Sequence, residues 1–269
     1  MSADINRHGT FSSSNAWKLM TNGKRDMTED EIEQHKKDFP KSRARTITTE
    51  FGAPALKYIK QVGYELLLGR PVGSEAEFKQ TSWGKLCEEW IHSEDELMSI
   101  AYKQLTNTRF FHKKIPFWSG APDWVIGTTV CDGKSPFSLE MFCDKIDILS
   151  KGVESYKEEF PNDYWQHISN AILLESNGIE ITHFEAIIYV PFKSELEGIR
   201  QFARDENDID LQRMYSFVNF KEDEELPYLV EGRHYTNINK FRFEISDLDK
   251  KELTERIIKA GKMLNKLWV

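Results

Sequence analysis

The feature that most constrains the fold is a mostly apolar run over residues 182–190. It is rich in β-branched and aromatic side chains, and Pro191 ends it. A strand that is apolar along nearly its whole length is buried on both faces, which is typical of a sheet with helices on each side. The run therefore predicts an interior strand of an α/β domain.

Helical signals dominate the first part of the chain. A serine run before Ala16 predicts a helix that begins near Ser14, and Thr28 with Glu31 has the spacing of a capping box at the start of a second helix. Residues 43–52 resemble a loop or a short extended piece. A third helix is predicted over residues 54–68, ended by Gly69. Apolar residues at helical spacing predict a fourth over residues 82–105.

Short strands and helices alternate after residue 110. Segments rich in aromatic and β-branched residues, separated by Gly and Pro, predict a strand meander; they cover residues 110–118, 123–126 and 128–135. Helices are predicted over 138–150, 163–175 and 248–267, and further strands over 214–220 and 240–245. This order predicts an α/β fold, with a mixed central sheet flanked by helices.

Bulk composition narrows the class of protein. A chain of 269 residues suits one domain of this kind, and no apolar run approaches the roughly 20 residues that span a bilayer. Residues 1–10 are polar rather than signal-like, so we expect a cytoplasmic protein with no membrane partner. The three cysteines, Cys87, Cys131 and Cys143, have no CxxC spacing and are interpreted as small buried hydrophobic residues.

The net charge of −8 argues against a protein that coats nucleic acid by bulk attraction. This charge is compatible with a nuclease, because a nuclease needs carboxylates to bind metal ions and only a local basic strip to contact DNA. Residues 1–45 carry nine Lys or Arg against seven acids, a balance of +2 that leaves −10 for the remainder. Any basic strip is therefore expected there, although an ordinary mixed-charge surface would have the same composition.

The stretch that carries chemistry contains Pro122-Asp123, followed nine residues later by Asp132-Gly133-Lys134. If the two pieces lie on adjacent strands, two carboxylates and an ammonium group converge at one sheet edge. Carboxylates hold Mg²⁺, and a lysine beside the metal can orient or help deprotonate a water that attacks a phosphodiester. Gly133, between them, would leave its carbonyl free as a further metal ligand.

One other interpretation of this stretch remains open, and a second is excluded by the sequence. Asp132-Gly133 is also a favoured two-residue hairpin turn, with Lys134 merely the next exposed residue. A register that uses Glu140 as the second acid places Phe142 where the lysine should be. The chain has no HxH or HExxH pair and no GxxxxGK[ST] phosphate loop, so a histidine-bound metal and an ATP-driven motor are not indicated.

Four motifs in order resemble the λ-type (YqaJ-like) phage exonucleases of the PD-(D/E)xK nuclease superfamily. They are the Pro122-Asp123 pair, Lys134-Ser135-Pro136, the stretch Trp83-Gly84-Lys85 with Glu88 three places on, and Tyr164-Trp165-Gln166. The resemblance covers roughly residues 7–190 and implies a restriction-endonuclease-like core. Tyr164 and Trp165 are interpreted as packing residues.

The resemblance implies a role for each matching residue. Asp123, Asp132 and the Gly133 carbonyl would ligate Mg²⁺ or Mn²⁺, and Glu88 would do so directly or through water. Lys134 would serve the nucleophilic water and Gln166 would position it, although Gln166 would also suit a half-buried helix. Glu89, next to Glu88, is interpreted as a solvated helix residue, and His167 as structural or exposed.

The segment from Arg7 to Ser14 resembles the family segment in which an arginine and a serine bind the 5′-phosphate of a DNA end. A frayed tail followed by an ordinary N-cap serine would have the same sequence. Two positions depart from the family pattern. Ala121 stands where a serine usually precedes the Pro-Asp pair, and Asp132 stands where the λ-type enzyme has glutamate. These departures bear on end preference more than on metal catalysis.

The resemblance thus implies a Mg²⁺-dependent exonuclease that degrades double-stranded DNA from an end, 5′ to 3′, in phage recombination. It also implies homo-oligomeric rings and a single-strand annealing partner. We expect a single domain with an end-binding part at about 1–80, a catalytic core at about 81–190, and C-terminal strands and helix at 191–269. The alternatives are an endonuclease or resolvase on the same core, and an inactive DNA-end-binding protein.

Overall fold

The computed structural model describes residues 8–72, 79–93, 102–105 and 108–268. Its α-helices are α1 (Ala16–Leu19), α2 (Glu29–Asp38), α3 (Ala53–Leu68), α4 (Lys79–Ser93), α5 (Leu139–Lys151), α6 (Val153–Glu159), α7 (Pro161–Ser176), α8 (Leu196–Asp205), α9 (Ile209–Tyr215) and α10 (Asp247–Trp268). Its strands are β1 (Phe11–Ser12), β2 (Gly23–Asp26), β3 (Thr46–Thr49), β4 (Lys103–Gln104), β5 (Phe110–Phe111), β6 (Trp118–Gly120), β7 (Trp124–Ile126), β8 (Thr129–Lys134), β9 (His183–Tyr189) and β10 (Ile238–Glu244). The chain also contains short 3-10 helices, among them η2 (Ser13–Asn15) and η4 (Ser216–Phe220).

The central sheet has the strand order β10-β9-β8-β7-β4, and it confirms the mixed α/β class. The β8 and β9 strands run parallel, while the other neighbours are antiparallel. β9 is the strand predicted from the apolar run, and it is buried on both faces. Phe184, Ala186 and Ile188 belong to one hydrophobic cluster, and Ile187 and Tyr189 belong to another.

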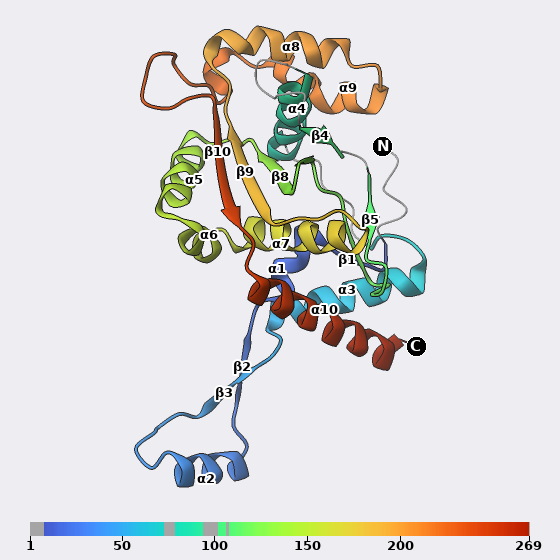
Figure 1. Ribbon diagram of the computed structural model, residues 1–269, viewed down its shortest axis with the longest axis vertical. Coiled ribbons are helices and arrows are strands. Elements are labelled where there is room, and N and C mark those ends of the chain that lie inside the picture. Colours follow the sequence, from blue (N-terminus) through green and yellow to red (C-terminus); the bar gives the residue numbers. More distant parts are fainter. Residues whose placement is uncertain (1–7, 73–78, 94–101, 106–107, 269) are drawn as a thin grey trace.

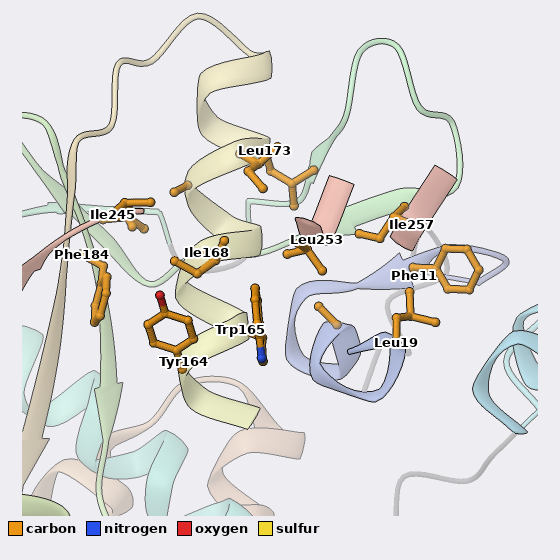
Figure 2. Close-up of a cluster of buried hydrophobic side chains, with 14 of the residues drawn as sticks. Phe11, Leu19, Tyr164, Trp165, Ile168, Leu173, Phe184, Ile245, Leu253 and Ile257 are labelled. Atoms are coloured by element: carbon orange, nitrogen blue, oxygen red, sulfur yellow. The ribbon is translucent and has the colours of Figure 1, made fainter. Parts of the chain in front are cut away.

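Helices cover both faces of this sheet (Figure 1). The larger cluster joins one face of β9 to α5, α6, α7 and α10, and it continues into α1 and α3. Figure 2 shows α7 in the middle of this core, with Tyr164 near Phe184 and Trp165 on the side of Leu19. The smaller cluster joins the opposite face to α4, α8 and α9. No described helix has an apolar stretch of the length that a bilayer crossing requires.

A second, three-stranded sheet has the order β1-β6-β5 and joins the amino-terminal segment to residues 110–120. β1 runs parallel to β6, with Phe11 opposite Trp118 and Ser12 opposite Ser119. The prediction of one continuous strand over 110–118 is wrong, because β5 and β6 form an antiparallel pair with a connection between them. The predicted meander placed residues 110–118 in the central sheet, but β5 and β6 pair in this second sheet instead.

The β2 and β3 strands pair over four residues and carry α2 between them, forming a projection that leaves the body of the molecule (Figure 1). The predicted capping box is present, since Thr28 Oγ1 accepts from the Glu31 N–H and the Glu31 carboxylate accepts from the Thr28 N–H. The helix predicted over 54–68 is also present, and Gly69 ends it at a φ of 63°.

Two predicted elements are wrong in type or length. Residues 214–220 are not a strand, because they lie in the end of α9 and in η4. Met214, Tyr215 and Val218 are buried at helical spacing, so they pack one helical face rather than a sheet. The helix predicted over 82–105 is present as α4 (Lys79–Ser93), but it does not reach residue 105, because Lys103–Gln104 forms β4 at the sheet edge; residues 94–101 lie outside the described residues. The sequence prediction did not include α6 and α8.

Candidate active site

The ends of β7 and β8 bring the two predicted acid motifs together. β7 pairs with β8 only from Trp124 opposite Cys131 to Ile126 opposite Thr129, whereas β8 continues along β9 as far as Lys134. Within the described part of the chain, no strand therefore pairs with the last three residues of β8 on the β7 side. Asp123 lies just before β7 on that side, and its Oδ2 accepts a hydrogen bond from the Gly133 N–H at 2.9 Å.

The hairpin interpretation of Asp132-Gly133 is wrong. The turn between β7 and β8 lies at Gly127, which has a φ of 55°, a conformation that glycine adopts without strain. Gly133 lies inside β8 opposite Ile187 of β9. A Cβ there would come within 2.9 Å of the Trp124 ring, so glycine is required for a close approach rather than for a turn.

Asp132 is the buried centre of the site, with only 1% of its surface exposed. Gln166 Nε2, from α7, donates to Asp132 Oδ1 at 2.6 Å. The ammonium of Lys134 forms an ion pair with the other carboxylate oxygen, Oδ2. Three of the residues that the resemblance singled out, from two elements, are thus in direct contact.

Glu88 of α4 lies within electrostatic range of these acids. Burial raises the pKa of Asp123 well above its ordinary value, and the carboxylates of Asp132 and Glu88 raise it further. The Lys134 ammonium and the Gly133 N–H oppose that shift. The carboxylates of Asp132 and Glu88 thus repel that of Asp123, and a cation bound beside Asp123 would relieve this repulsion.

Glu89 is not the solvated residue that the sequence suggested. It lies beside Tyr215, and burial raises the pKa of its carboxyl group, with Glu206 and Asp208 adding to the rise. Its neighbours thus include α9 and the loop before it. Of the two adjacent glutamates, Glu88 is the one that contributes to the field at Asp123.

Lys134 remains an ammonium in this environment. Burial alone would lower its pKa, but the carboxylates of Asp132, Asp163 and Asp123 outweigh that effect and raise the pKa above its ordinary value. A lysine in this state donates hydrogen bonds and neutralises negative charge. It cannot accept a proton at neutral pH, so as the site stands it is suited to orienting a group rather than to acting as a base.

The donor set fits a hard divalent cation in its chemistry. Asp123, Asp132 and Glu88 supply carboxylate oxygens, and oxygen donors are those that Mg²⁺ prefers. Within the described residues, no three His, Cys, Asp or Glu side chains close around a single point as a complete metal cage. Asp132 instead holds the Lys134 ammonium, a positive charge placed against these acids. These carboxylates would therefore supply only part of the oxygen ligands of such a cation.

A buried ion pair beside the site was not predicted from the sequence. Lys145 of α5 pairs with Asp163 at the start of α7, and the two side chains are only 9% and 7% exposed. The Lys145 ammonium also lies 4.0 Å from the centroid of the Phe160 ring. The signal that could have revealed it is a lysine on the apolar face of α5, three residues after Phe142.

A pocket of about 540 Å³ lies beside the site, although Asp123, Asp132 and Gln166 are not among its lining residues. Its walls come from α4, the end of β8, α5 and the start of α7, and they include Glu88, Gly133, Lys134, Lys145 and Asp163. Two ammonium groups, of Lys134 and Lys145, and two carboxylates, of Glu88 and Asp163, thus line the same pocket.

The predicted end-binding residues are placed only in part. Arg7 lies outside the described residues. Ser14 is exposed in η2, where its hydroxyl hydrogen-bonds with that of Ser12 at 3.3 Å. Its neighbour Ser13 is buried and hydrogen-bonds with Ser169, three residues beyond Gln166 on α7, at 2.9 Å. The serine segment is therefore fastened to the same helix that carries Gln166.

The remaining residues behave as packing groups. Tyr164 and Trp165 are buried in the core, and the Tyr164 hydroxyl donates to Asp249 Oδ2 at 2.5 Å. His167 is buried and stacked on Phe184, with ring centroids 4.6 Å apart. The cysteines are free: Cys87 and Cys131 are buried and Cys143 is half-buried. Glu140 lies in the first turn of α5 and is exposed, outside the site.

Comparison with known proteins gives similarity at the level of structure. No protein-family model and no curated protein sequence matches the chain. An alkaline exonuclease from Laribacter hongkongensis, LHK-Exo in complex with dAMP, has a TM-score of 0.55 at 12% identity, over 97% of this chain and 91% of that one. Another structure of LHK-Exo has a TM-score of 0.53 at 11% identity, over 97% and 93%. A phage-related exonuclease from Haemophilus somnus 129PT has a TM-score of 0.51 at 13% identity, over 97% and 95%. The chain thus shares the fold of alkaline and phage-related exonucleases over nearly its full length, as the sequence resemblance predicted.

Proposed function

We propose that this protein is a metal-dependent deoxyribonuclease with a PD-(D/E)xK core, which degrades double-stranded DNA from an end in the 5′ to 3′ direction. The observation that carries the proposal is the meeting of Asp123, Asp132 and Lys134 at the free edge of β8, with Gln166 bonded to Asp132. The exonucleases that share the fold support the reaction class. The family's role in phage recombination is part of the same proposal.

Asp123, Asp132 and the Gly133 carbonyl would hold Mg²⁺ or Mn²⁺, with Glu88 bound directly or through water. The Gly133 N–H points toward Asp123, and the N–H and C=O of a strand residue point to the same side. Its carbonyl therefore faces the acids, where β8 has no strand partner. The bound metal supplies a lowered pKa for a coordinated water and charge stabilisation at the phosphate.

The protein's own groups would orient the reactants. The Lys134 ammonium, held beside Asp132, can donate a hydrogen bond to the attacking water or to a phosphate oxygen. Gln166 holds one Asp132 oxygen in place and can direct its amide oxygen, left free by the bond that its nitrogen donates, toward the same water. Because these groups are fixed by β8 and α7, they need little reorganisation when negative charge develops at phosphorus.

Preference for a 5′-phosphorylated end is assigned to Arg7 and Ser14. A guanidinium fork suits a terminal phosphate, and Ser14 presents an exposed hydroxyl on the segment that Ser13 fastens to α7. A charge-assisted contact contributes about 1.5–3 kcal/mol, roughly tenfold to hundredfold in rate when it acts in the transition state. Ala121 lacks the hydroxyl that family members place nearby, so we expect the lower end of this range.

The test compares linear and closed-circular duplex DNA in Mg²⁺ and in EDTA, with the label at the 5′ or the 3′ end. The proposal requires loss of linear duplex only, dependence on the metal, and early release of nucleotides from the 5′ end. A 5′-phosphorylated duplex should be degraded faster than its 5′-hydroxyl counterpart, and Arg7→Ala should remove that difference.

Each alternative function has its own outcome in this experiment. Cleavage of closed circles would identify an endonuclease or resolvase. Binding to ends without cleavage in Mg²⁺ or Mn²⁺ would identify an inactive end-binding protein. Ring assembly and capture of a single-strand annealing protein complete the proposal, and the molar mass in solution tests the first of these directly.

A further inference from the structure

The projection formed by residues 23–49, here called the arm, contributes nothing to the described hydrophobic core. Its helix α2 has no buried residue, and the arm leads away from the body of the protein (Figure 1). Helix stability in proteins comes mostly from packing an apolar face. Because α2 buries none of its residues, most of its surface is available for contact with another molecule.

Local contacts keep the arm ordered in the absence of core packing. Arg25 forms a two-bonded ion pair with Glu31, with nitrogen-to-oxygen distances of 2.7 and 2.6 Å. The same Glu31 closes the capping box with Thr28. At the far end of α2, His35 Nε2 hydrogen-bonds with Ser42 Oγ at 2.8 Å, and its ring lies 5.1 Å from that of Phe39. The arm is therefore a defined structure rather than a loose loop.

The base of the arm is fixed to the carboxy-terminal helix. The Arg256 guanidinium, on α10, donates to the Leu19 carbonyl at 3.3 Å and also contacts the Glu50 carbonyl and the Asn22 side chain. Lys259, also on α10, pairs with the Glu50 carboxylate. These contacts bracket both ends of the arm, so they hold its direction relative to the body.

The positive charge of the arm is concentrated in its second half. Residues 36–45 carry five Lys or Arg and one acid, a local balance of +4 in a protein whose net charge is −8. Lys37 has a partner, Glu33, at 3.4 Å. Four cations in this stretch are exposed and form no ion pair with a described residue; they are Lys36, Lys41, Arg43 and Arg45.

We infer that the arm binds the phosphate backbone of duplex DNA at a distance from the scissile bond. The inference rests on the proposed function, because that function supplies the duplex. A protein with a net charge of −8 repels DNA over most of its surface, so unpaired cations on a fixed projection concentrate attraction at one place. Exposed Lys and Arg without carboxylate partners can exchange counterions for phosphates without first breaking an ion pair.

The arm would increase the affinity for duplex DNA and the length of duplex that is bound, without taking part in hydrolysis. Contacts of this kind carry no sequence information, and they are strongly weakened by salt. Their removal should weaken binding of a long duplex that reaches both the pocket and the arm. A duplex of about one helical turn occupies only the pocket and should be hydrolysed normally.

The experiment compares the full-length protein with a quadruple variant, Lys36→Gln, Lys41→Gln, Arg43→Gln and Arg45→Gln. Binding to a labelled linear duplex of about four helical turns is measured in EDTA over a series of salt concentrations. The slope of log K against log salt should fall by about 0.9 for each phosphate that the variant no longer neutralises, hence by roughly 3 to 4. Hydrolysis of a duplex of about one turn in Mg²⁺ should change by less than about twofold, because the arm does not take part in the transition state.

A matched control removes four exposed lysines outside the arm, Lys57, Lys60, Lys251 and Lys262, each replaced by Gln. An equal decrease of slope in the control would show an effect of net charge and overturn the inference. An unchanged slope in the arm variant would also overturn it. A change in molar mass of the arm variant would assign the arm to contact between copies of the chain instead. If the unmutated protein cleaves no DNA, the proposed function fails, while the binding slopes still decide the role of the arm.

Discussion

Gly133 donates its backbone N–H to the carboxylate of Asp123 at 2.9 Å, at the point where β7 and β8 have stopped pairing. This hydrogen bond fixes one acid against the strand that carries the other, with Asp132 and Lys134 on either side of Gly133. The site is therefore assembled by backbone geometry, and its parts should be sensitive to changes that leave the fold intact.

Removing a charged group from the site should abolish DNA cleavage. Asp123→Asn, Asp132→Asn and Lys134→Ala should each lower the cleavage rate by on the order of 10²-fold or more, because the site works by preorganised charge. Circular dichroism checks that each variant is folded, and Glu140→Gln, an exposed acid outside the site, serves as the control. Full activity in a folded Lys134→Ala variant would contradict the proposed mechanism.

Divalent metal should raise the melting temperature. Asp123, Asp132 and Glu88 repel one another, and a cation that binds only the folded state relieves this repulsion and stabilises that state. For a chain of this size each 1 kcal/mol corresponds to about 2–4 °C, so millimolar Mg²⁺ or Mn²⁺ should give a measurable shift. Asp123→Asn should reduce the shift. No response of the unmutated protein to either metal would count against a metal site.

Gly133→Ala should lower both stability and activity. The added Cβ would lie 2.9 Å from the ring of Trp124, which is fully buried, and such overpacking costs about 1–3 kcal/mol. Movement of β8 would also disturb the hydrogen bond to Asp123. Gly84→Ala is the matched control, because a Cβ there meets nothing within 4 Å and alanine favours a helix by up to about 1 kcal/mol. Urea unfolding should separate the two variants by the sign of the change.

Removing only one partner of the pair between Lys145 and Asp163 should destabilise the fold more, per residue changed, than replacing both partners. Lys145→Met leaves a buried carboxylate without its partner, which costs about 3–5 kcal/mol. The double variant Lys145→Met with Asp163→Asn should cost less than the sum of the single changes. Urea unfolding of the four proteins gives the coupling energy. Strictly additive costs would show that the pair contributes no interaction of its own.

Long periodic segments could be predicted from the sequence, and so could the proximity of Asp123, Asp132 and Lys134. The core helices α3, α5, α7 and α10 and the strand β9 each carry enough buried positions to define their period. The proximity of the three site residues could be predicted because Asp132 and Lys134 lie two residues apart on β8 and Asp123 directly precedes β7, the strand before it.

Relations between distant residues could not be predicted. Residues 214–220 are rich in aromatic and apolar side chains, and only the packing of Met214 and Val218 against α4 and α8 decides for a helix. The partner of Lys145 lies 18 residues away on another helix, and Arg256 reaches Asn22 across 234 residues. Local spacing contains no information about such pairs, because the tertiary fold creates them.

The folded protein should become less stable as the pH falls from about 6.5 to about 4, because of the lowered pKa of His167. Its imidazole is buried against Phe184, and burial lowers its pKa from 6.5 to about 4, an effect that the Asp132 and Asp163 carboxylates only partly offset. In the unfolded chain the same group titrates near its ordinary value of about 6.5. Between these two values the unfolded state holds a proton that the folded state does not, so stability rises with pH there. The contribution to the free energy of unfolding is complete above about pH 6.5 and is gone by about pH 4, a difference of up to about 3 kcal/mol at about 1.4 kcal/mol per pH unit.

Urea unfolding of His167→Gln should show a smaller decrease in the free energy of unfolding between these two pH values than the unmutated protein shows. An identical pH dependence in the two proteins would mean that His167 does not carry the effect.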